Sequence, residues 1–132
     1  MPSEPVWISA EDVIEINAEA VARTGERFLL RDKGLLESAV ARPRHRWAYG
    51  EEDILSLAVA LLLGVALNHP FEQGNKRTAF IAAVEFLELN GYQLVPEANT
   101  RDFADLIVSA IEKRISDEEL TARFAELVRA KP

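Results

Sequence analysis

The chain has 132 residues, of which 48% are hydrophobic and 28% are charged, so we expect a single domain over residues 1–132 with its own apolar core. It has no cysteine, which excludes a disulfide framework and any thiolate metal site. Its formal net charge of -7 argues against a general nucleic-acid binder, because such proteins need a basic surface.

The sequence shows no signal for export or for membrane insertion. Residues 1–7 lack the basic start and the apolar run of a signal peptide. The longest apolar stretch, residues 54–67, contains Ser56 and is shorter than the roughly 20 residues that cross a bilayer. We therefore expect a cytoplasmic protein without a membrane partner.

Helical spacing of apolar residues dominates the sequence and predicts an all-α fold. Ser9 is expected to cap a first helix that ends at Gly25. Residues 28–30 are apolar enough for a short strand. Asp32 is expected to cap a second, shorter helix that stops by Pro43, because a proline inside a helix removes a hydrogen bond and clashes with the preceding turn.

The next segment, residues 42–50, contains proline and glycine without an amphipathic period, so we expect an exposed connector. It holds a basic cluster beside two aromatic residues: Arg42, Arg44, His45 and Arg46, beside Trp47 and Tyr49. Such a cluster suits an acidic partner, a bound nucleotide or RNA. The alternative is an ordinary solvated loop with Trp47 packed on the domain.

Two helices are expected at the centre of the bundle. The first, residues 53–68, is apolar around most of its circumference, and the second, residues 75–90, stops at Gly91. Residues 92–95 are expected to be extended. A helix from Asn99 or Thr100 follows, and Ser116 is expected to cap the last helix, with a buried stripe of Leu120, Phe124, Leu127 and Val128.

The loop between the two central helices, residues 69–77, reads His-Pro-Phe-Glu-Gln-Gly-Asn-Lys-Arg. Pro70 disfavours helical geometry at His69, which places the imidazole at the mouth of the loop. Gly74 can adopt backbone angles that other residues resist, and Asn75 is a good N-cap for the next helix. The free N–H groups at such a helix start can bind an anion.

Two cations, Lys76 and Arg77, lie in the first turn of that helix, where the helix dipole disfavours positive charge by roughly 0.3 to 1 kcal/mol each. A bound polyphosphate would compensate, because it would meet the N–H groups and both cations together. His69 can accept a hydroxyl proton near neutral pH, so the loop suits phosphate transfer from a nucleotide to an alcohol. The structural alternative is that His69 only ends a helix, that Pro70 and Gly74 only make a turn, and that Lys76 and Arg77 are solvated surface charges. Phe71 is expected to anchor the loop in the core.

The same loop carries a family motif. His69, Phe71, Gly74, Asn75, Lys76 and Arg77 match, in one block, the motif His-x-Phe-x-(Asp/Glu/Asn)-(Gly/Ala)-Asn-(Gly/Lys)-Arg. Residues 34–43 and 89–92 also look like segments of small death-on-curing proteins. The sequence therefore resembles the Fic/Doc family, and the likeness covers most of residues 9–112.

The resemblance implies a Fic fold, an all-α helical bundle with the motif loop between two central helices. It also implies a short flap over the loop, which we expect to be residues 42–50. In the family, the histidine deprotonates a target hydroxyl, which assigns that role to His69. Gly74 and Asn75 would then shape the phosphate cradle, and Arg77 would clamp phosphate.

Position 76 distinguishes two branches of the family. Members that transfer AMP carry glycine there and a second arginine three residues after the motif arginine, whereas this chain has Lys76 and Phe80. This pattern resembles the Doc branch, which implies a catalytic Lys76 and transfer of the γ-phosphate of ATP to a protein, with translation elongation factors as the target class. A lysine side chain would also crowd a loop that an α-phosphate must approach closely.

Gln73 departs from the motif, because the family usually has an acid there that meets Mg²⁺. An amide oxygen is a weaker ligand for this cation than a carboxylate. Three arrangements remain: Gln73 binds the metal weakly, Glu72 reaches it instead, or ATP holds most of it. Glu72 is equally well explained as a solvated loop charge.

The resemblance implies the toxin of a toxin–antitoxin pair, with ATP as co-substrate. The chain lacks the (Ser/Thr)-x-x-x-Glu-(Gly/Asn) stretch with which some family members inhibit themselves, so we expect a separate antitoxin protein. Two rival functions stay open: AMP transfer by the same site, and a non-catalytic binding module in which Gln73 marks lost metal chemistry. RNA binding is disfavoured by the net negative charge of the chain.

Overall fold

A computed structural model describes residues 3–95 and 100–132, with the backbone alone for residues 100–103. Two short strands, β1 (Tyr92–Leu94) and β2 (Val128–Ala130), form a small antiparallel sheet. The remaining elements are helices, which confirms the predicted all-α class: α1 (Ala10–Arg23), α2 (Lys33–Ala48), α3 (Ile54–Asn68), α4 (Asn75–Leu89), α5 (Thr100–Ile111) and α6 (Asp117–Leu127). The alternative helix start at Asn99 lies outside the described residues.

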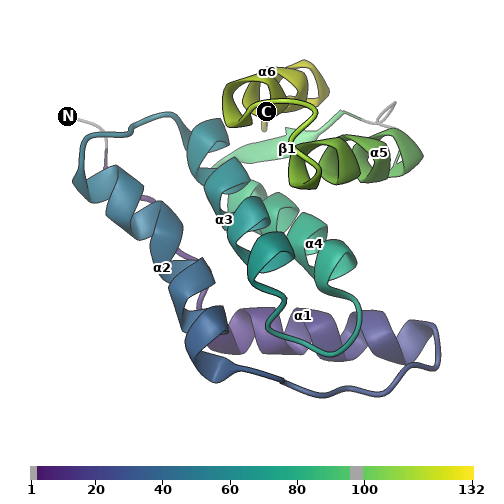
Figure 1. The fold of residues 1–132 in the computed structure, drawn as a ribbon. Coiled ribbons are helices and arrows are strands. Elements are labelled where there is room, and N and C mark those ends of the chain that lie inside the picture. Colours follow the sequence, from purple (N-terminus) through teal and green to yellow (C-terminus); the bar gives the residue numbers. More distant parts are fainter. Residues whose placement is uncertain (1–2, 96–99) are drawn as a thin grey trace.

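The helix α3 forms the centre of the bundle, between α2 and α4 (Figure 1). Every residue from 57 to 66 is buried, which agrees with its apolar sequence on all sides. The helix α1 crosses the end of the bundle at which the loop joins α3 to α4, while α5 and α6 cover the opposite end (Figure 1). Within the described ranges no helix is both long and apolar enough to cross a membrane.

The helix α2 continues well past Pro43, so the prediction that it stops there is wrong, as is the exposed connector at residues 42–50. An interior proline costs about 3 kcal/mol or more, because residue 43 cannot donate to the carbonyl of Ala39. Tertiary packing compensates for this loss. Pro43 is buried, and Trp47 packs edge-on against Trp7 with 6.4 Å between the ring centroids.

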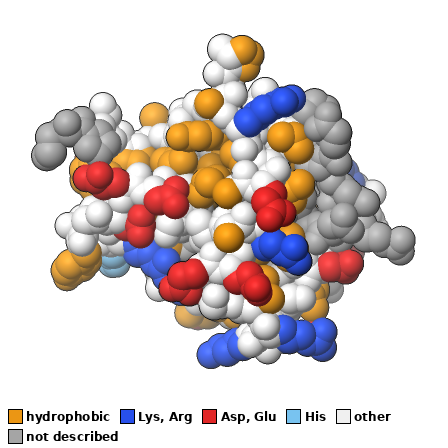
Figure 2. All heavy atoms as spheres, turned by 90° about the horizontal axis from the view of Figure 1, so that it is seen from above, with side chains coloured by type: hydrophobic (Ala, Val, Ile, Leu, Met, Phe, Trp, Pro, Cys, Tyr) orange, Lys and Arg blue, Asp and Glu red, His pale blue; other side chains and the backbone are white. Residues whose placement is uncertain are grey.

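The basic cluster of α2 is divided among separate contacts. Arg44 lies 5.7 Å from the centre of the Trp7 ring, and Arg46 pairs with Asp117 at 3.5 Å. Acidic and basic side chains are interspersed on the face that Figure 2 shows, with apolar side chains between them. The face that Figure 2 shows is therefore not uniformly basic.

Close contact between α2 and α3 fixes the end of α3 that leads into the loop. A Cβ atom at Gly64 would lie 3.1 Å from the Cα and carbonyl oxygen of Ala39, so a larger residue would push the helices apart. At the end of α3, the Asn68 Nδ2 donates to the Leu35 carbonyl at 2.9 Å. The loop therefore starts from a fixed position.

The predicted helix caps are largely confirmed. Ser9 accepts a hydrogen bond from the Asp12 N–H at 3.1 Å, and Ser116 caps α6. The last helix ends at Leu127, however, so the prediction that Val128 belongs to its buried stripe is wrong. Val128 instead pairs with Leu94 of β1, whose backbone groups need a partner.

Glu85 on α4 gives a testable pH dependence. Partial burial raises its pKa, and the nearby acids add to this rise: Asp12, Glu88, Glu19 and Glu15. Since the folded state holds this proton more tightly than the unfolded state, Glu85 destabilises the fold at pH values above its raised pKa, and this penalty vanishes below the ordinary value of 4.5.

We therefore expect Glu85→Gln to raise the Tm at pH 7 by about 1 to 3 °C. Thermal unfolding at pH 7 and at about pH 4 would measure this, and most of the gain should disappear at the lower pH because the carboxyl is then mostly protonated in both states. An equal gain at both pH values would contradict an electrostatic origin.

Candidate functional site

The segment that joins α1 to α2, residues 26–32, runs beside the loop between α3 and α4 (Figure 1). The Arg31 N–H donates to the Pro70 carbonyl at 2.7 Å, and the Glu72 N–H donates to the Leu29 carbonyl at 3.0 Å. Hydrogen bonds in both directions therefore hold the loop against this segment.

The strand predicted at residues 28–30 is reduced to one β-bridge between Leu30 and Phe71. Phe71 is fully buried, as predicted for an anchor of the loop. The flap prediction for residues 42–50 is wrong, because those residues belong mostly to α2. Residues 26–32 take the place beside the loop instead.

His69 ends α3 and is exposed at the mouth of the loop, as predicted. Its backbone is left-handed, with φ 49° and ψ 54°, a conformation that costs a non-glycine residue about 1 to 3 kcal/mol. The following Pro70 disfavours the right-handed alternative. The imidazole Nδ1 lies 3.4 Å from the Asn75 Nδ2, which is long for a hydrogen bond.

Asn75 holds the loop together from within. Its Oδ1 accepts from the Phe71 N–H at 3.0 Å and its Nδ2 donates to the Phe71 carbonyl at 2.8 Å. These bonds fix the orientation of the amide, so the Nδ2 group presents a hydrogen to His69. The prediction that Asn75 is the N-cap of α4 is wrong, because its side chain serves the loop and Gly74 takes the cap position.

The start of α4 lacks a side-chain cap, because Gly74 occupies the cap position with φ 74°. Side chains cap four other helix starts within the described residues: Ser9, Asp32, Asp53 and Ser116. A Cβ atom at Gly74 would lie 3.2 Å from Val21 Cγ1 and 3.3 Å from Arg77 Nη2. A side chain at this position would therefore collide with α1 and with Arg77. The N–H groups of the first turn have no side-chain cap, and such helix starts are suited to binding an anion.

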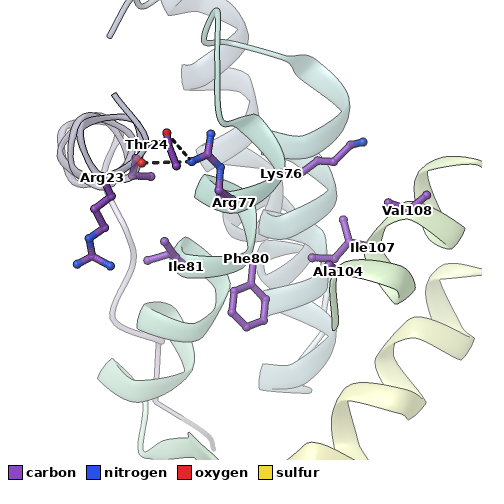
Figure 3. Close-up of a pocket in the computed structure, with 10 residues that line it drawn as sticks. Arg23, Thr24, Lys76, Arg77, Phe80, Ile81, Ala104, Ile107 and Val108 are labelled. Atoms are coloured by element: carbon purple, nitrogen blue, oxygen red, sulfur yellow. Dashed lines mark hydrogen bonds between the residues drawn. The ribbon is translucent and has the colours of Figure 1, made fainter. Parts of the chain in front are cut away.

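The two cations of this turn point apart (Figure 3). Arg77 Nη1 donates to the Ala20 carbonyl at 3.2 Å and to Thr24 Oγ1 at 3.1 Å, while Nη2 pairs with the Glu26 carboxylate. Lys76 is exposed and points towards α5 (Figure 3). The structure thus brings Arg77 to α1 and does not bring both cations to one point.

An apolar groove of about 430 Å³ opens beside these cations (Figure 3). Its walls come from α1, α4 and α5 and include Ala20, Phe80, Ile81, Ala104, Ile107 and Val108. Arg23 and Lys76 add positive charge to this lining. A concave apolar surface with a few polar groups is typical of a binding site.

The residues considered for Mg²⁺, Glu72 and Gln73, lie in the loop without a cluster of potential metal ligands around them in the described part of the chain. Glu72 is engaged with Arg27 at 3.1 Å, and Gln73 offers only a neutral amide to a cation that prefers carboxylates. Within residues 3–95 and 104–132, no group of three or more acidic or histidine side chains lies close enough to hold a metal ion.

Asn17 of α1 is a further residue of the site that the sequence analysis did not single out. It is buried, and its Nδ2 donates to the Gln73 carbonyl at 2.8 Å and to Thr78 Oγ1 at 3.0 Å. The sequence did contain a signal for this role, because Asn17 lies one helical turn from both Val13 and Val21 on the apolar face of α1. A polar residue on that face needs a partner.

Glu26 is a second residue that the sequence analysis missed. Hydrogen bonds from Thr24 and then from Arg77 lower its pKa, so its carboxylate is ionised at neutral pH. No local pattern indicated this role, because Glu26 and Arg77 are 51 positions apart in the chain.

The fold and the site together define a helical-bundle protein with an exposed histidine and an uncapped helix start in the loop between its two central helices. Residues 7–87 match the Fic/DOC family, and the chain belongs to this family. It is 37% identical over 122 residues to "Toxin Doc" of Mycolicibacterium smegmatis, covering 90% of this chain and 91% of that relative. It is 34% identical over 110 residues to "Protein kinase doc" of Escherichia phage P1, covering 83% of this chain and 85% of that relative.

Proposed function

We propose that the protein is a Doc-like toxin that transfers the γ-phosphate of ATP to a hydroxyl group of a protein target, with a translation elongation factor as the target class. One observation carries this proposal: the exposed His69 and the uncapped start of α4 belong to one loop, which the hydrogen bonds of Asn75 hold in a fixed conformation. The names of the two relatives, a toxin and a protein kinase, support it.

The transfer would proceed in one displacement. The target oxygen forms a bond to the γ-phosphorus, the bond from that phosphorus to the bridging oxygen breaks, and ADP leaves. His69 accepts the hydroxyl proton at Nε2, which requires the tautomer with hydrogen on Nδ1. In that tautomer the exposed imidazole must turn its Nδ1 away from the Asn75 amide, because two N–H groups would otherwise face each other.

Phosphate binding falls to the N–H groups at the start of α4, to Arg77 and to Lys76. The start of α4 has no side-chain cap, and the fixed loop keeps its N–H groups in place. Because Glu72 is engaged and Gln73 is neutral, we expect the phosphates of ATP, rather than these side chains, to hold Mg²⁺.

Labelled ATP tests the reaction. We expect His69-dependent labelling of a protein in cell extract from ATP labelled at the γ-phosphate, and none from ATP labelled at the α-phosphate, with His69→Ala as control. Label from the α-phosphate would instead establish AMP transfer. No His69-dependent label from either would leave a non-catalytic binding module.

We also propose that a separate antitoxin protein acts on this toxin in the cytoplasm. The apolar groove beside Lys76 and Arg77 offers such a partner a surface next to the site. Its basic residues, Arg23 and Lys76, favour a segment with an apolar face and acidic flanks.

A further inference from the structure

Asn17 is a buried polar residue whose side-chain amino group faces the start of α4. Its Nδ2 donates to the Gln73 carbonyl at 2.8 Å and to Thr78 Oγ1 at 3.0 Å, whereas its Oδ1 accepts no hydrogen bond from the described residues. The reverse orientation of the amide would set its oxygen against the Gln73 carbonyl, and two acceptors repel each other. The orientation of Asn17 therefore serves its donors, although it leaves a buried acceptor unpaired.

The bond to Gln73 determines the direction of the next N–H group along the chain. The peptide between Gln73 and Gly74 is trans, and in a planar trans peptide the carbonyl and the N–H point in opposite directions. Because this carbonyl points at Asn17 of α1, the Gly74 N–H points away from α1. Gly74 is partly exposed, and no described residue accepts a hydrogen bond from its N–H, so the group is available to a ligand.

The glycine at position 74 gives this bond its importance. Gly74 has φ 74°, and a glycine populates positive and negative φ about equally well. The peptide between Gln73 and Gly74 could therefore turn over without a steric penalty at residue 74. In the flipped orientation a carbonyl oxygen would replace the N–H and repel an anion at the start of α4. The hydrogen bond from Asn17 selects the orientation that attracts one.

We propose that Asn17 is a positioning residue for phosphate binding, because it aims the Gly74 N–H at the anion. The inference rests on the proposed function and assigns part of its phosphate binding to a residue of α1. The first hydrogen bond of α4 runs from the Thr78 N–H to the Gly74 carbonyl at 2.9 Å, so the N–H groups of residues 74–77 have no acceptor within the helix. Helical geometry directs the last three of these groups, and Asn17 directs the first.

NMR titration with inorganic tripolyphosphate tests this role. In the natural protein we expect the Gly74 amide signal to shift on binding and its hydrogen exchange with solvent to slow, because the anion accepts that hydrogen. Asn17→Leu keeps a similar volume without a donor. It should bind tripolyphosphate about 10- to 100-fold more weakly, the range for loss of one hydrogen bond to a charged group, and its Gly74 signal should no longer respond.

Thr78→Val is the matched control. Thr78 is as fully buried as Asn17, and its substitution removes the other hydrogen bond of the amide while the bond to Gln73 stays. Its tripolyphosphate affinity and its Gly74 response should equal those of the natural protein, even where thermal unfolding shows a loss of stability as large as that of Asn17→Leu. Natural affinity with lost stability therefore separates positioning from a purely structural role.

Natural tripolyphosphate affinity in folded Asn17→Leu or Asn17→Ala would overturn the inference. So would an unchanged Gly74 signal in the natural protein at saturating tripolyphosphate, a result that needs no variant to fold. A Gly74 response that depends on Asn17, without any phosphate transfer from ATP, would uphold the inference and refute the proposed function. Transfer from ATP without a Gly74 response would uphold the proposed function and refute the role of Asn17.

Discussion

His69→Ala is expected to reduce phosphate transfer about 10²- to 10⁴-fold, the usual contribution of a positioned general base. The fold should survive, because His69 is exposed and its imidazole lies as far as 3.4 Å from the Asn75 amide, too far for a strong hydrogen bond. Transfer of γ-label to protein and thermal unfolding of the purified variant would measure both effects.

A second substitution, His69→Asn, separates the loss of the base from changes in the backbone. Asparagine tolerates the left-handed conformation of this position better than alanine does. We therefore expect this variant to be at least as stable as His69→Ala and equally inactive. Substantial transfer by either folded variant would remove His69 from the role of base.

The features predicted correctly from the sequence are those that neighbouring residues determine. Pro70 and Gly74 shape the loop through their own backbone preferences, and Ser9 caps α1 through a residue three positions away. The path of α2 through Pro43 was not predictable in this way, because the compensating contacts come from Trp7, far away in the sequence.

In the site, too, the features that neighbouring residues determine were predicted, and those that depend on distant contacts were not. The spacing of the motif was sufficient to place His69 beside the start of α4, but the position of Arg77 depends on its partners in and just after α1. Asn75 was assigned to the correct place with the wrong role, because an asparagine at a helix start is ordinarily a cap. The Asn75 side-chain amide turns into the loop because the backbone groups of Phe71 are buried and need partners, and this burial is visible only in the structure.

Asn75→Ala is expected to lower the free energy of unfolding by about 2 to 6 kcal/mol, because it leaves the N–H and carbonyl of Phe71 without a partner, and each unpaired buried group costs about 1 to 3 kcal/mol. Phe71 is fully buried, so water cannot replace the lost bonds. The loop would also lose its fixed geometry, and misplacement of His69 and the start of α4 should reduce transfer about 100-fold.

Asn90→Ala is a matched control at the other end of α4. Asn90 makes a similar pair of bonds with Val6, accepting from its N–H at 2.8 Å and donating to its carbonyl at 2.9 Å, and its Nδ2 also donates to the Phe86 carbonyl at 2.7 Å. Val6 is exposed, so water can replace these bonds, and we expect a loss of roughly 1 kcal/mol or less with unchanged transfer. Denaturant unfolding, and transfer rates at a temperature where both variants are folded, would test the contrast. If Asn75→Ala behaved like Asn90→Ala in both measurements, the amide of Asn75 would not be what holds the loop in its active form.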